Sequence, residues 1–173
     1  GCNSQTPITN NLNSATSFFY NFNTSLQGFE ATSDPGDTPA AWSPSMVTEV
    51  TQPLGGSDVI TIRRATGDGN LVTAPASGSA DLTLASTTGL SANDLVVAST
   101  CEGSDAFQLA AITGTALAHN TGAGTPGNAT QPLSRSYANG QVYPITTVSY
   151  YVRDSGYTPS LYRRINSSSA TEL

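Results

Sequence analysis

Apolar and polar residues alternate in short runs along most of the chain, and these runs lack the period of a long helix. Residues 58–65, 81–85 and 94–99 are rich in β-branched or alternating apolar residues and are bounded by turn residues, so each predicts a strand. Residues 106–113 predict another short strand. Because no segment longer than ten residues keeps the helical period, the pattern predicts a mainly β chain with an antiparallel sheet and long loops.

The last third of the chain predicts a β-hairpin. Residues 141–152 and 160–165 form its two strands, and a Ser-Gly turn separates them. Every second position from Val148 to Val152 is apolar, which predicts that this side of the strand faces inward. Pro144 lacks an amide proton, so it predicts an edge strand or a bulge at that point.

Two segments predict long loops. Residues 33–45 contain three prolines and predict a surface loop that Trp42 pins to the body of the protein. Residues 119–134 are of low complexity and rich in Gly, Pro and Thr. Structureless loops of that length are uncommon unless they are functional or disordered.

The composition narrows the possible functions. The chain has 173 residues, which suits a single domain spanning residues 1–173, and only 10% of them are charged. It has no Lys, and its formal net charge is −6. Such an acidic chain is expected to bind neither nucleic acid nor anionic lipid, because both depend on basic residues. It also has no stretch of about 20 apolar residues that could cross a bilayer.

The beginning of the sequence and its two cysteines predict an exported fragment. The chain starts with Gly1-Cys2 and not with Met, so we expect it to be cut from a longer protein, truncated at both ends. Cys2 and Cys101 are too few and too far apart for a zinc site, so no metal is expected. In a chain rich in Ser, Thr and Asn they favour one structural disulfide in an oxidising compartment. Two buried free thiols are the alternative.

Candidate catalytic residues are few. His119 is the single imidazole, and without a Gly-x-Ser-x-Gly elbow it predicts a surface or turn histidine. Asp58, Asp81 and Asp94 each stand at the start of a predicted strand. A pair of them would suit glycosidic cleavage, but hydrogen bonding to nearby backbone amides is the simpler interpretation. The residues therefore predict a protein without catalytic residues or a cofactor.

Paired arginines occur twice on predicted strands, as Arg63-Arg64 and Arg163-Arg164. Because neighbouring strand residues point to opposite faces, each pair should direct one side chain outward and one to the other face. The second of these needs carboxylates or carbonyls as partners, and a role in holding loops is expected.

Tyrosines and glycosylation sequons are the remaining candidates. Four tyrosines could form a sugar-stacking platform, although packing within the sheet is the default: Tyr150, Tyr151, Tyr157 and Tyr162. Three sequons arise readily by chance in a chain of this composition: those at Asn23, Asn128 and Asn166.

An ordered set of short segments resembles the PilW family of type IV pilus minor pilins and covers nearly the whole chain. The segments are Gly1-Cys2, Gly28-Phe-Glu30, Ala41-Trp-Ser-Pro44, Gly56-Ser-Asp-Val-Ile-Thr-Ile-Arg63, Asp94-Leu-Val-Val, Cys101, Ala106-Phe-Gln, Leu117-Ala-His119, Leu133-Ser-Arg-Ser-Tyr137, Val142-Tyr143, Ser149-Tyr-Tyr-Val152, Pro159-Ser-Leu-Tyr-Arg-Arg164 and Glu172-Leu173. The chain departs from many relatives at Asn93, where they have Gly; Asn also tolerates the left-handed conformation, so the turn is expected to survive.

The resemblance implies a fold and a role. It implies a head domain that becomes an α+β pilin-like fold when a preceding apolar helix is included, with a Cys2–Cys101 disulfide that ties the end of that helix to the sheet. It implies a non-enzymatic minor pilin that joins other minor pilins and the major pilin in a tip or priming complex. The protein would reside in the bacterial inner membrane and periplasm before assembly, through the missing helix, and in the extracellular pilus afterwards.

Three alternative functions remain for this sequence. A J-type pseudopilin of type II secretion shares the pilin-like fold and a tip position. A secreted adhesin or carbohydrate-binding module would use the tyrosines and the loop at residues 119–134. A secreted glycosidase would need a pair among the three aspartates, and no such pair is evident in the sequence.

Overall fold

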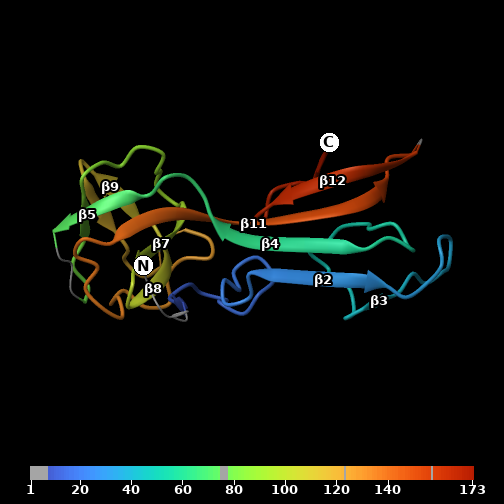
Figure 1. Cartoon of the computed structure of the whole chain (residues 1–173), viewed down its shortest axis with the longest axis horizontal. Helices are drawn as coiled ribbons and strands as arrows, with labels where there is room; N and C mark the ends of the chain where they lie inside the picture. The colour runs from blue at the N-terminus through green and yellow to red at the C-terminus, as the bar shows by residue number, and fades with distance from the viewer. Residues whose placement is uncertain (1–7, 75–77, 123, 157) are drawn as a thin grey trace. The chain divides into compact units, whose positions relative to one another are not determined.

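The computed structural model describes residues 8–74, 78–122, 124–156 and 158–173. Within these ranges the chain is built from strands and loops without a helix, and 43% of it is strand. The prediction of a mainly β chain is confirmed (Figure 1). The described part also holds no helix with the length and apolar character needed to span a bilayer.

The chain divides into two compact units, each formed by two separate stretches of sequence. Unit 1 comprises residues 1–23 and 65–145, and unit 2 comprises residues 24–64 and 146–173. The long strand β11 (Gln141–Asp154) gives its first residues to unit 1 and the rest to unit 2. The single domain expected from the sequence stays a prediction.

Unit 1 contains eight strands, which pair in the order β1-β8-β7-β11-β5-β6-β10-β9. Besides the first part of β11 they are β1 (Ile8–Asn10), β5 (Asn70–Ala74), β6 (Leu82–Leu84), β7 (Leu95–Thr100), β8 (Gly103–Gln108), β9 (Ala111–Thr113) and β10 (Ala116–Ala118). The pairs are antiparallel except β1 with β8, which is parallel. The predicted antiparallel sheet is therefore present with one exception.

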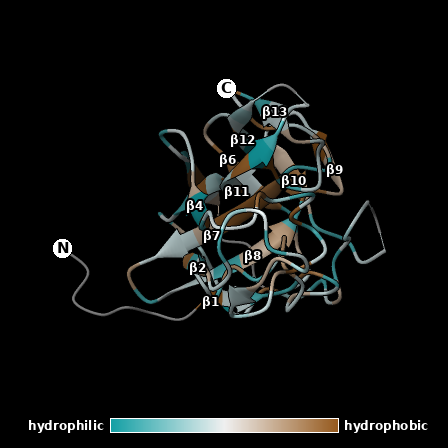
Figure 2. Ribbon diagram, turned by 90° about the vertical axis from the view of Figure 1, so that its right-hand side faces the viewer, coloured by the Kyte–Doolittle hydropathy of each residue, from teal (hydrophilic) through white to brown (hydrophobic). Residues whose placement is uncertain are grey.

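Two apolar clusters form the core of unit 1. The larger includes Val96 and Phe107 from the central hairpin and Leu117 from β10. The smaller is built around Leu12 and Ile145. Figure 2 shows the apolar colouring of the strands that contribute to these clusters. Burial of these side chains is the main source of stability for a sheet with so few charged residues.

Pro144 lies in a central strand, which corrects the predicted edge position. It pairs with Val96 of β7, and β11 stands between β7 and β5 in the sheet. The carbonyl of Pro144 accepts a hydrogen bond from the amide of Thr66 at 2.8 Å. The neighbouring segment at Thr66 therefore pairs with the carbonyl oxygen of Pro144. This contact does not need an N–H from Pro144, so the proline is tolerated there.

Unit 2 holds one sheet with the strand order β3-β2-β4-β11-β12-β13. Its strands besides β11 are β2 (Leu26–Ala31), β3 (Trp42–Ser43), β4 (Val59–Ala65), β12 (Pro159–Ile165) and β13 (Thr171–Glu172). Strand β4 reaches into unit 1 with its last residue. The predicted hairpin is present as β11 and β12, which pair antiparallel from Val148↔Ile165 to Asp154↔Pro159.

Local details agree with the turn chemistry and refine the strand predictions. Asn93 has a φ of 72°, as expected for a turn that elsewhere uses Gly. The predicted strand at residues 106–113 is divided into β8 and β9, which are separate partners of β7 and β10. Strand β2 follows a segment that contains Asn and Thr, which also favour loops. Its sequence therefore does not distinguish it from a loop.

Candidate interaction surface

The two faces of the unit 2 sheet differ in what covers them. Side chains alternate between the faces of a strand. The hydroxyls of Thr61 on β4 and Ser149 on β11 are hydrogen-bonded at 2.8 Å, so they share one face. Both side chains are almost fully buried. We call this side the covered face, and the opposite side the open face.

The segment at residues 44–57 packs over the covered face. Its Leu54 amide donates to the carbonyl of Val152 at 2.9 Å. The hydroxyl of Thr51 lies 3.3 Å from that of Tyr151, and Arg164 donates to the carbonyl of Glu49. These contacts explain why residues with polar side chains on this face are shielded from water.

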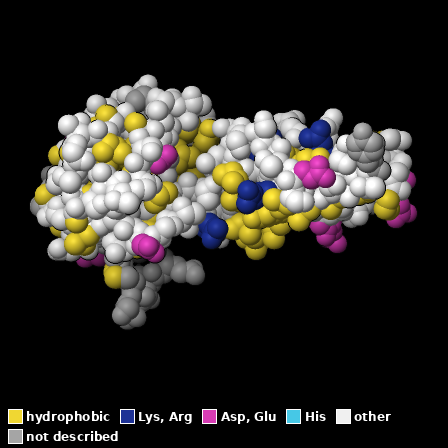
Figure 3. Space-filling model, turned by 90° about the horizontal axis from the view of Figure 1, so that it is seen from above, with side chains coloured by type: hydrophobic (Ala, Val, Ile, Leu, Met, Phe, Trp, Pro, Cys, Tyr) yellow, Lys and Arg dark blue, Asp and Glu magenta, His cyan; other side chains and the backbone are white. Residues whose placement is uncertain are grey.

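The open face is apolar across four strands. It carries Leu26 on β2, Ile60 and Ile62 on β4, Val148, Tyr150 and Val152 on β11, and Leu161 and Ile165 on β12. Of the six large apolar side chains that are most exposed among the described residues, four lie here: Leu26 at 61%, Ile60 at 43%, Leu161 at 47% and Ile165 at 39%. Figure 3 shows apolar side chains gathered on this part of the molecule, with Arg side chains beside them.

Such a surface is typical of an interaction site. Single exposed apolar residues are ordinary on soluble proteins, but a contiguous exposed patch marks a place where another apolar surface binds. The cross-strand pairs Leu26↔Ile62 and Val152↔Leu161 join apolar residues of β2 with β4 and of β11 with β12, and β4 pairs with β11 between them.

Charged residues of both signs lie within the patch and at its borders. Arg163 stands opposite Tyr150 in the middle of the hairpin, and Arg64 is exposed at the end of β4. At the other end of β4, Asp58 and Glu30 are exposed on neighbouring strands. A partner of mixed charge is therefore better matched to this face than a purely anionic or cationic one.

The alternation between Val148 and Val152 identified the less buried side of this strand as the inward one. Val148 is buried at 8% exposed, but Tyr150 and Val152 are partly exposed, whereas Thr147, Ser149 and Tyr151 on the other side are each about 1% exposed. Sequence alternation identifies two faces but does not say which one the rest of the chain covers. Here the covering loop satisfies polar groups, so the more polar side is buried.

His119 is buried, which corrects its prediction as a surface or turn histidine. Its side chain is 1% exposed, and the ring packs edge-on against Phe107 with centroids 5.5 Å apart. Nδ1 lies 2.8 Å from the carbonyl oxygen of Gln131, and Nε2 lies 2.9 Å from that of Ala80. The imidazole thus lies between the carbonyl groups of Gln131 and Ala80 inside unit 1.

Two of the three candidate aspartates accept hydrogen bonds from backbone amides. Asp58 Oδ1 accepts from the amide of Ala31 at 2.8 Å, and Asp94 Oδ2 accepts from the amide of Ser91 at 2.7 Å. Asp81 is exposed. The backbone role considered for these residues is therefore observed for Asp58 and Asp94.

The arginine pairs divide between the two faces as their sequence predicts. Arg63 is 4% exposed and donates to the carbonyl of Thr24 and to Oε1 of Gln27, each at 3.0 Å. Burial lowers the pKa of the Arg63 guanidinium. Arg164 holds the covering segment through Glu49. Both inward arginines thus hold loops through carbonyl groups, as predicted.

The tyrosines do not form one platform. Tyr151 is buried on the covered face, and Tyr162 stacks on it with centroids 6.3 Å apart. The guanidinium of Arg153 lies 5.3 Å from the ring centre of Tyr162. Tyr150 lies on the opposite face, and Tyr157 is outside the described residues. The rings that are described therefore pack within the sheet or join the open face.

The sequons and cysteines have different outcomes. Asn23 is exposed, but Asn128 is 2% exposed and donates its amide to the carbonyl of Gln108 at 2.8 Å. Asn128 is therefore not accessible to a glycan in the folded chain.

Cys101 lies in the turn between β7 and β8 and is not a free thiol. Cys2 lies outside the described residues, so its pairing with Cys101 stays a prediction.

The parts of the chain that the structure describes contain no cluster of three or more His, Cys, Asp or Glu side chains suited to a metal ion. No family model matches the chain, and comparison with curated proteins and with solved structures finds no match. The open face was missed by sequence reasoning because its signal, apolar alternation on β4, β11 and β12, was interpreted as core.

Proposed function

We propose that the chain is the β-rich head of a PilW-type minor pilin. In this proposal it is a non-enzymatic subunit of type IV pilus assembly that acts in a tip or priming complex with other minor pilins and the major pilin. Its place before assembly is the bacterial inner membrane and periplasm, and its place afterwards is the extracellular pilus.

The open face is the observation that supports this proposal best. Complete burial of one Leu or Ile side chain contributes roughly 1.5–3 kcal/mol, so several partly exposed ones provide a strong drive for association. Strands lie about 4.8 Å apart, and a helix with its side chains is about 10 Å wide. The apolar strip on β2, β4, β11 and β12 therefore has the width that a single apolar helix of a pilin-type subunit needs.

The fate of the candidate catalytic residues supports a binding role. His119 is enclosed between two carbonyl groups, and Asp58 and Asp94 accept from backbone amides. These side chains stabilise loops and turns. A subunit that acts by assembly needs a stable fold with a binding surface, and it needs no side chain for proton transfer.

Pilus assembly in a strain that lacks the gene tests the proposal. The full-length gene should restore surface pili. Ile60→Asp and Leu161→Asp, which place charges on the open face, should abolish restoration while leaving the purified protein folded by circular dichroism. Thr158→Asp in the exposed turn before β12 is the matched control and should restore pili fully.

Two outcomes would contradict the proposal. One is a normal number of pili in the deletion strain together with lost type II secretion, which assigns the protein to the J-type pseudopilins. The other is an upstream reading frame that encodes an ordinary secretory signal or a separate folded domain. A short basic leader followed by about 20 apolar residues is the upstream sequence that the proposal requires.

A further inference from the structure

The outer edge of β2 has no paired strand along its first half. The amide of Arg63 on β4 donates to the carbonyl of Ser25 at 2.7 Å. Because backbone groups alternate in direction along an antiparallel pair, every second residue from Ser25 onward faces β4, and the intervening ones face outward. Strand β3 meets this outer edge at Glu30. Among the described residues, no strand pairs with the outward groups of Leu26 and Gly28.

A hollow of about 550 Å³ lies beside this unpaired stretch. Its walls include Gly28 on β2 and Ile60 on β4, which are cross-strand neighbours. A Cβ atom placed on Gly28 would meet nothing within 4 Å. The edge therefore has both free backbone groups and room for a side chain that a neighbouring strand would bring over Gly28.

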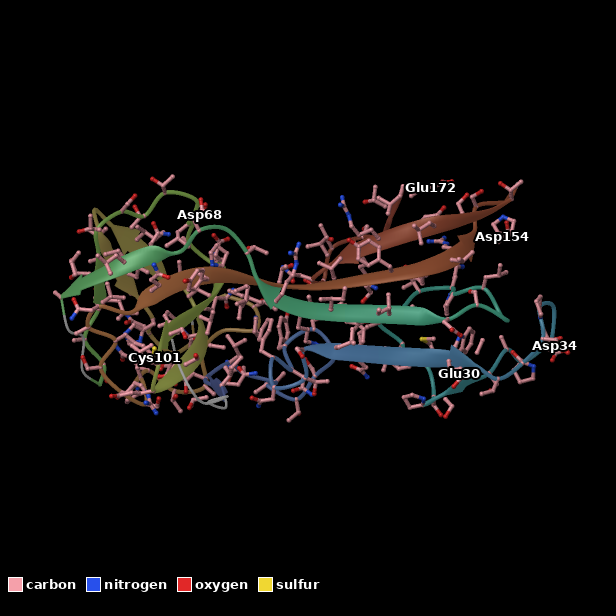
Figure 4. All side chains as sticks on the ribbon, viewed as in Figure 1. Glu30, Asp34, Asp68, Cys101, Asp154 and Glu172 are labelled. Carbon is pink, nitrogen blue, oxygen red and sulfur yellow. The ribbon has the colours of Figure 1, made fainter. Side chains whose placement is uncertain are left out.

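The hollow is acidic at one end. Glu30 and Asp58 both line it, next to the last recorded β2–β4 pair Phe29↔Val59, and Asp58 Oδ1 also accepts from the amide of Ala31 at 2.8 Å. Neither carboxylate lies within ion-pair distance of an Arg in the part of the chain that the structure describes. Figure 4 shows Glu30 beside β2.

We propose that the outer edge of β2 binds an extended segment of a partner protein as an added strand. The segment pairs with the backbone of Leu26 and Gly28, and its side chain opposite Gly28 is apolar and covers the hollow next to Ile60. A neighbouring Arg or Lys of the segment lies between Glu30 and Asp58. This mode supplies affinity through backbone hydrogen bonds and specificity through alternate side chains.

A second copy of this chain matches the edge less well than a basic segment. Each copy carries a net charge of −6 and would bring the same two carboxylates toward the site. The edge is also only two outward residues long before β3 begins, so an extended segment fits it more easily than a folded neighbour. The inference goes beyond the proposed function because it concerns the backbone edge of β2, although the hollow beside that edge shares Ile60 with the open face.

Binding of synthetic peptides to the purified chain tests the inference. The probe is a short fluorescent peptide of alternating Thr and Val with one central Arg, and the comparison peptide has Glu in place of that Arg. The Arg peptide should bind and should protect the amide protons of Leu26 and Gly28 from exchange. Because surface ion pairs contribute about 0.2–1 kcal/mol, Glu30→Gln should weaken binding about 1.4-fold to fivefold.

Two substitutions at one position separate backbone pairing from side-chain effects. Gly28→Pro removes an outward N–H that has no partner among the described residues, so the fold should persist while peptide binding is lost. Gly28→Ala keeps the N–H and should bind the peptide. Leu161→Asp on the open face should leave peptide binding unchanged, which distinguishes this inference from the proposed function.

Three results would overturn the inference. The first is no binding of the Arg peptide at millimolar concentration, and the second is binding that Gly28→Pro leaves unchanged in a folded protein. The third is a concentration-dependent dimer that Gly28→Pro abolishes and the peptide does not disturb, because that result would assign the edge to a second copy.

Discussion

The hydroxyl groups of Thr61 and Ser149 form a 2.8 Å hydrogen bond in the interior of the unit 2 sheet. Both residues are at most 1% exposed, so neither hydroxyl has water as an alternative partner. Thr61→Val keeps the shape of the side chain and leaves Ser149 unpaired. It should lower the free energy of unfolding by about 1–3 kcal/mol.

The double variant Thr61→Val with Ser149→Ala should recover most of that loss, because it removes both polar groups together. Urea unfolding followed by the fluorescence of Trp42 measures the effect, since this single Trp belongs to unit 2 and donates to the carbonyl of Ser57 at 3.0 Å. Equal losses for the single and double variants would show that the unpaired Ser149 hydroxyl is not the source of the loss. Thr158→Val, in the exposed turn, is the control.

The same pair shows how far the sequence could predict the fold. Strands β4, β7, β11 and β12 were predicted because each is rich in β-branched residues or alternates clearly. Which face of β4 and β11 is covered depends on the segment at residues 44–57, and a contact so distant in sequence leaves no local signal. The burial of His119 was missed for the same reason, because its two carbonyl partners belong to other loops.

The candidate site was even less accessible from the sequence. The residues of the open face were all visible as apolar positions, but an apolar position predicts burial and not exposure. Only the arrangement of four strands shows that they form a patch. The unpaired edge at Gly28 likewise requires the register between β2 and β4, which no local pattern encodes.

Asn128 should tolerate little change, because its side chain is bonded both to the end of β8 and to the segment at residues 119–120. Oδ1 accepts from the amide of Gln108 at 2.7 Å, and Nδ2 donates to the carbonyls of Gln108, His119 and Asn120 at 2.8–3.2 Å. Asn128→Asp places a charged oxygen against these carbonyls. We expect a loss of at least about 3 kcal/mol in the free energy of unfolding.

Thermal unfolding followed by circular dichroism measures the loss for Asn128→Asp. Asn23→Asp is the matched control, since Asn23 is exposed, and it should melt like the wild type. If both variants melted at the same temperature, the buried network around Asn128 would not contribute to stability.

His119 should stabilise the loops that hold Gln131 and Ala80 through its ring N–H. His119→Phe fills the space but removes the ring N–H between the carbonyls of Gln131 and Ala80, at a cost of about 1–3 kcal/mol. His119→Gln retains one donor group and should lie between the wild type and the Phe variant. Thr121→Ala, at an exposed neighbouring position, should have no effect. A Phe variant as stable as the wild type would contradict this role.

The pairing of Cys2 with Cys101 predicts a covalent link that peptide mapping can detect. Mass spectrometry of the digested, non-reduced protein should show one peptide pair that contains both residues. In the chain-entropy model, a bridge that closes a loop of about 100 residues stabilises the fold by about 4.7 kcal/mol. Reduction should therefore lower the melting temperature, and two alkylatable thiols in the oxidised protein would contradict the prediction.

Tyr137 should make the protein sensitive to alkaline pH. Its side chain is fully buried, and its pKa is raised well above the usual value of 10, mainly by burial and also by the nearby charge of Asp105. The unfolded chain releases this proton near pH 10, whereas the folded chain retains it. Stability is therefore complete below pH 10 and falls as the pH rises toward the pKa of the folded state, by up to about 1.4 kcal/mol per pH unit.

Tyr137→Phe isolates this contribution from the other tyrosines. The hydroxyl of Tyr137 lies near Ser134 and Asp105 but makes no hydrogen bond of normal length and angle among the described residues, so the substitution should cost little at neutral pH. Above pH 10 the variant should lose stability less steeply than the wild type, in urea unfolding series measured at closely spaced pH values. Parallel curves for the two proteins between pH 9 and pH 11 would show that the buried phenol does not titrate with unfolding.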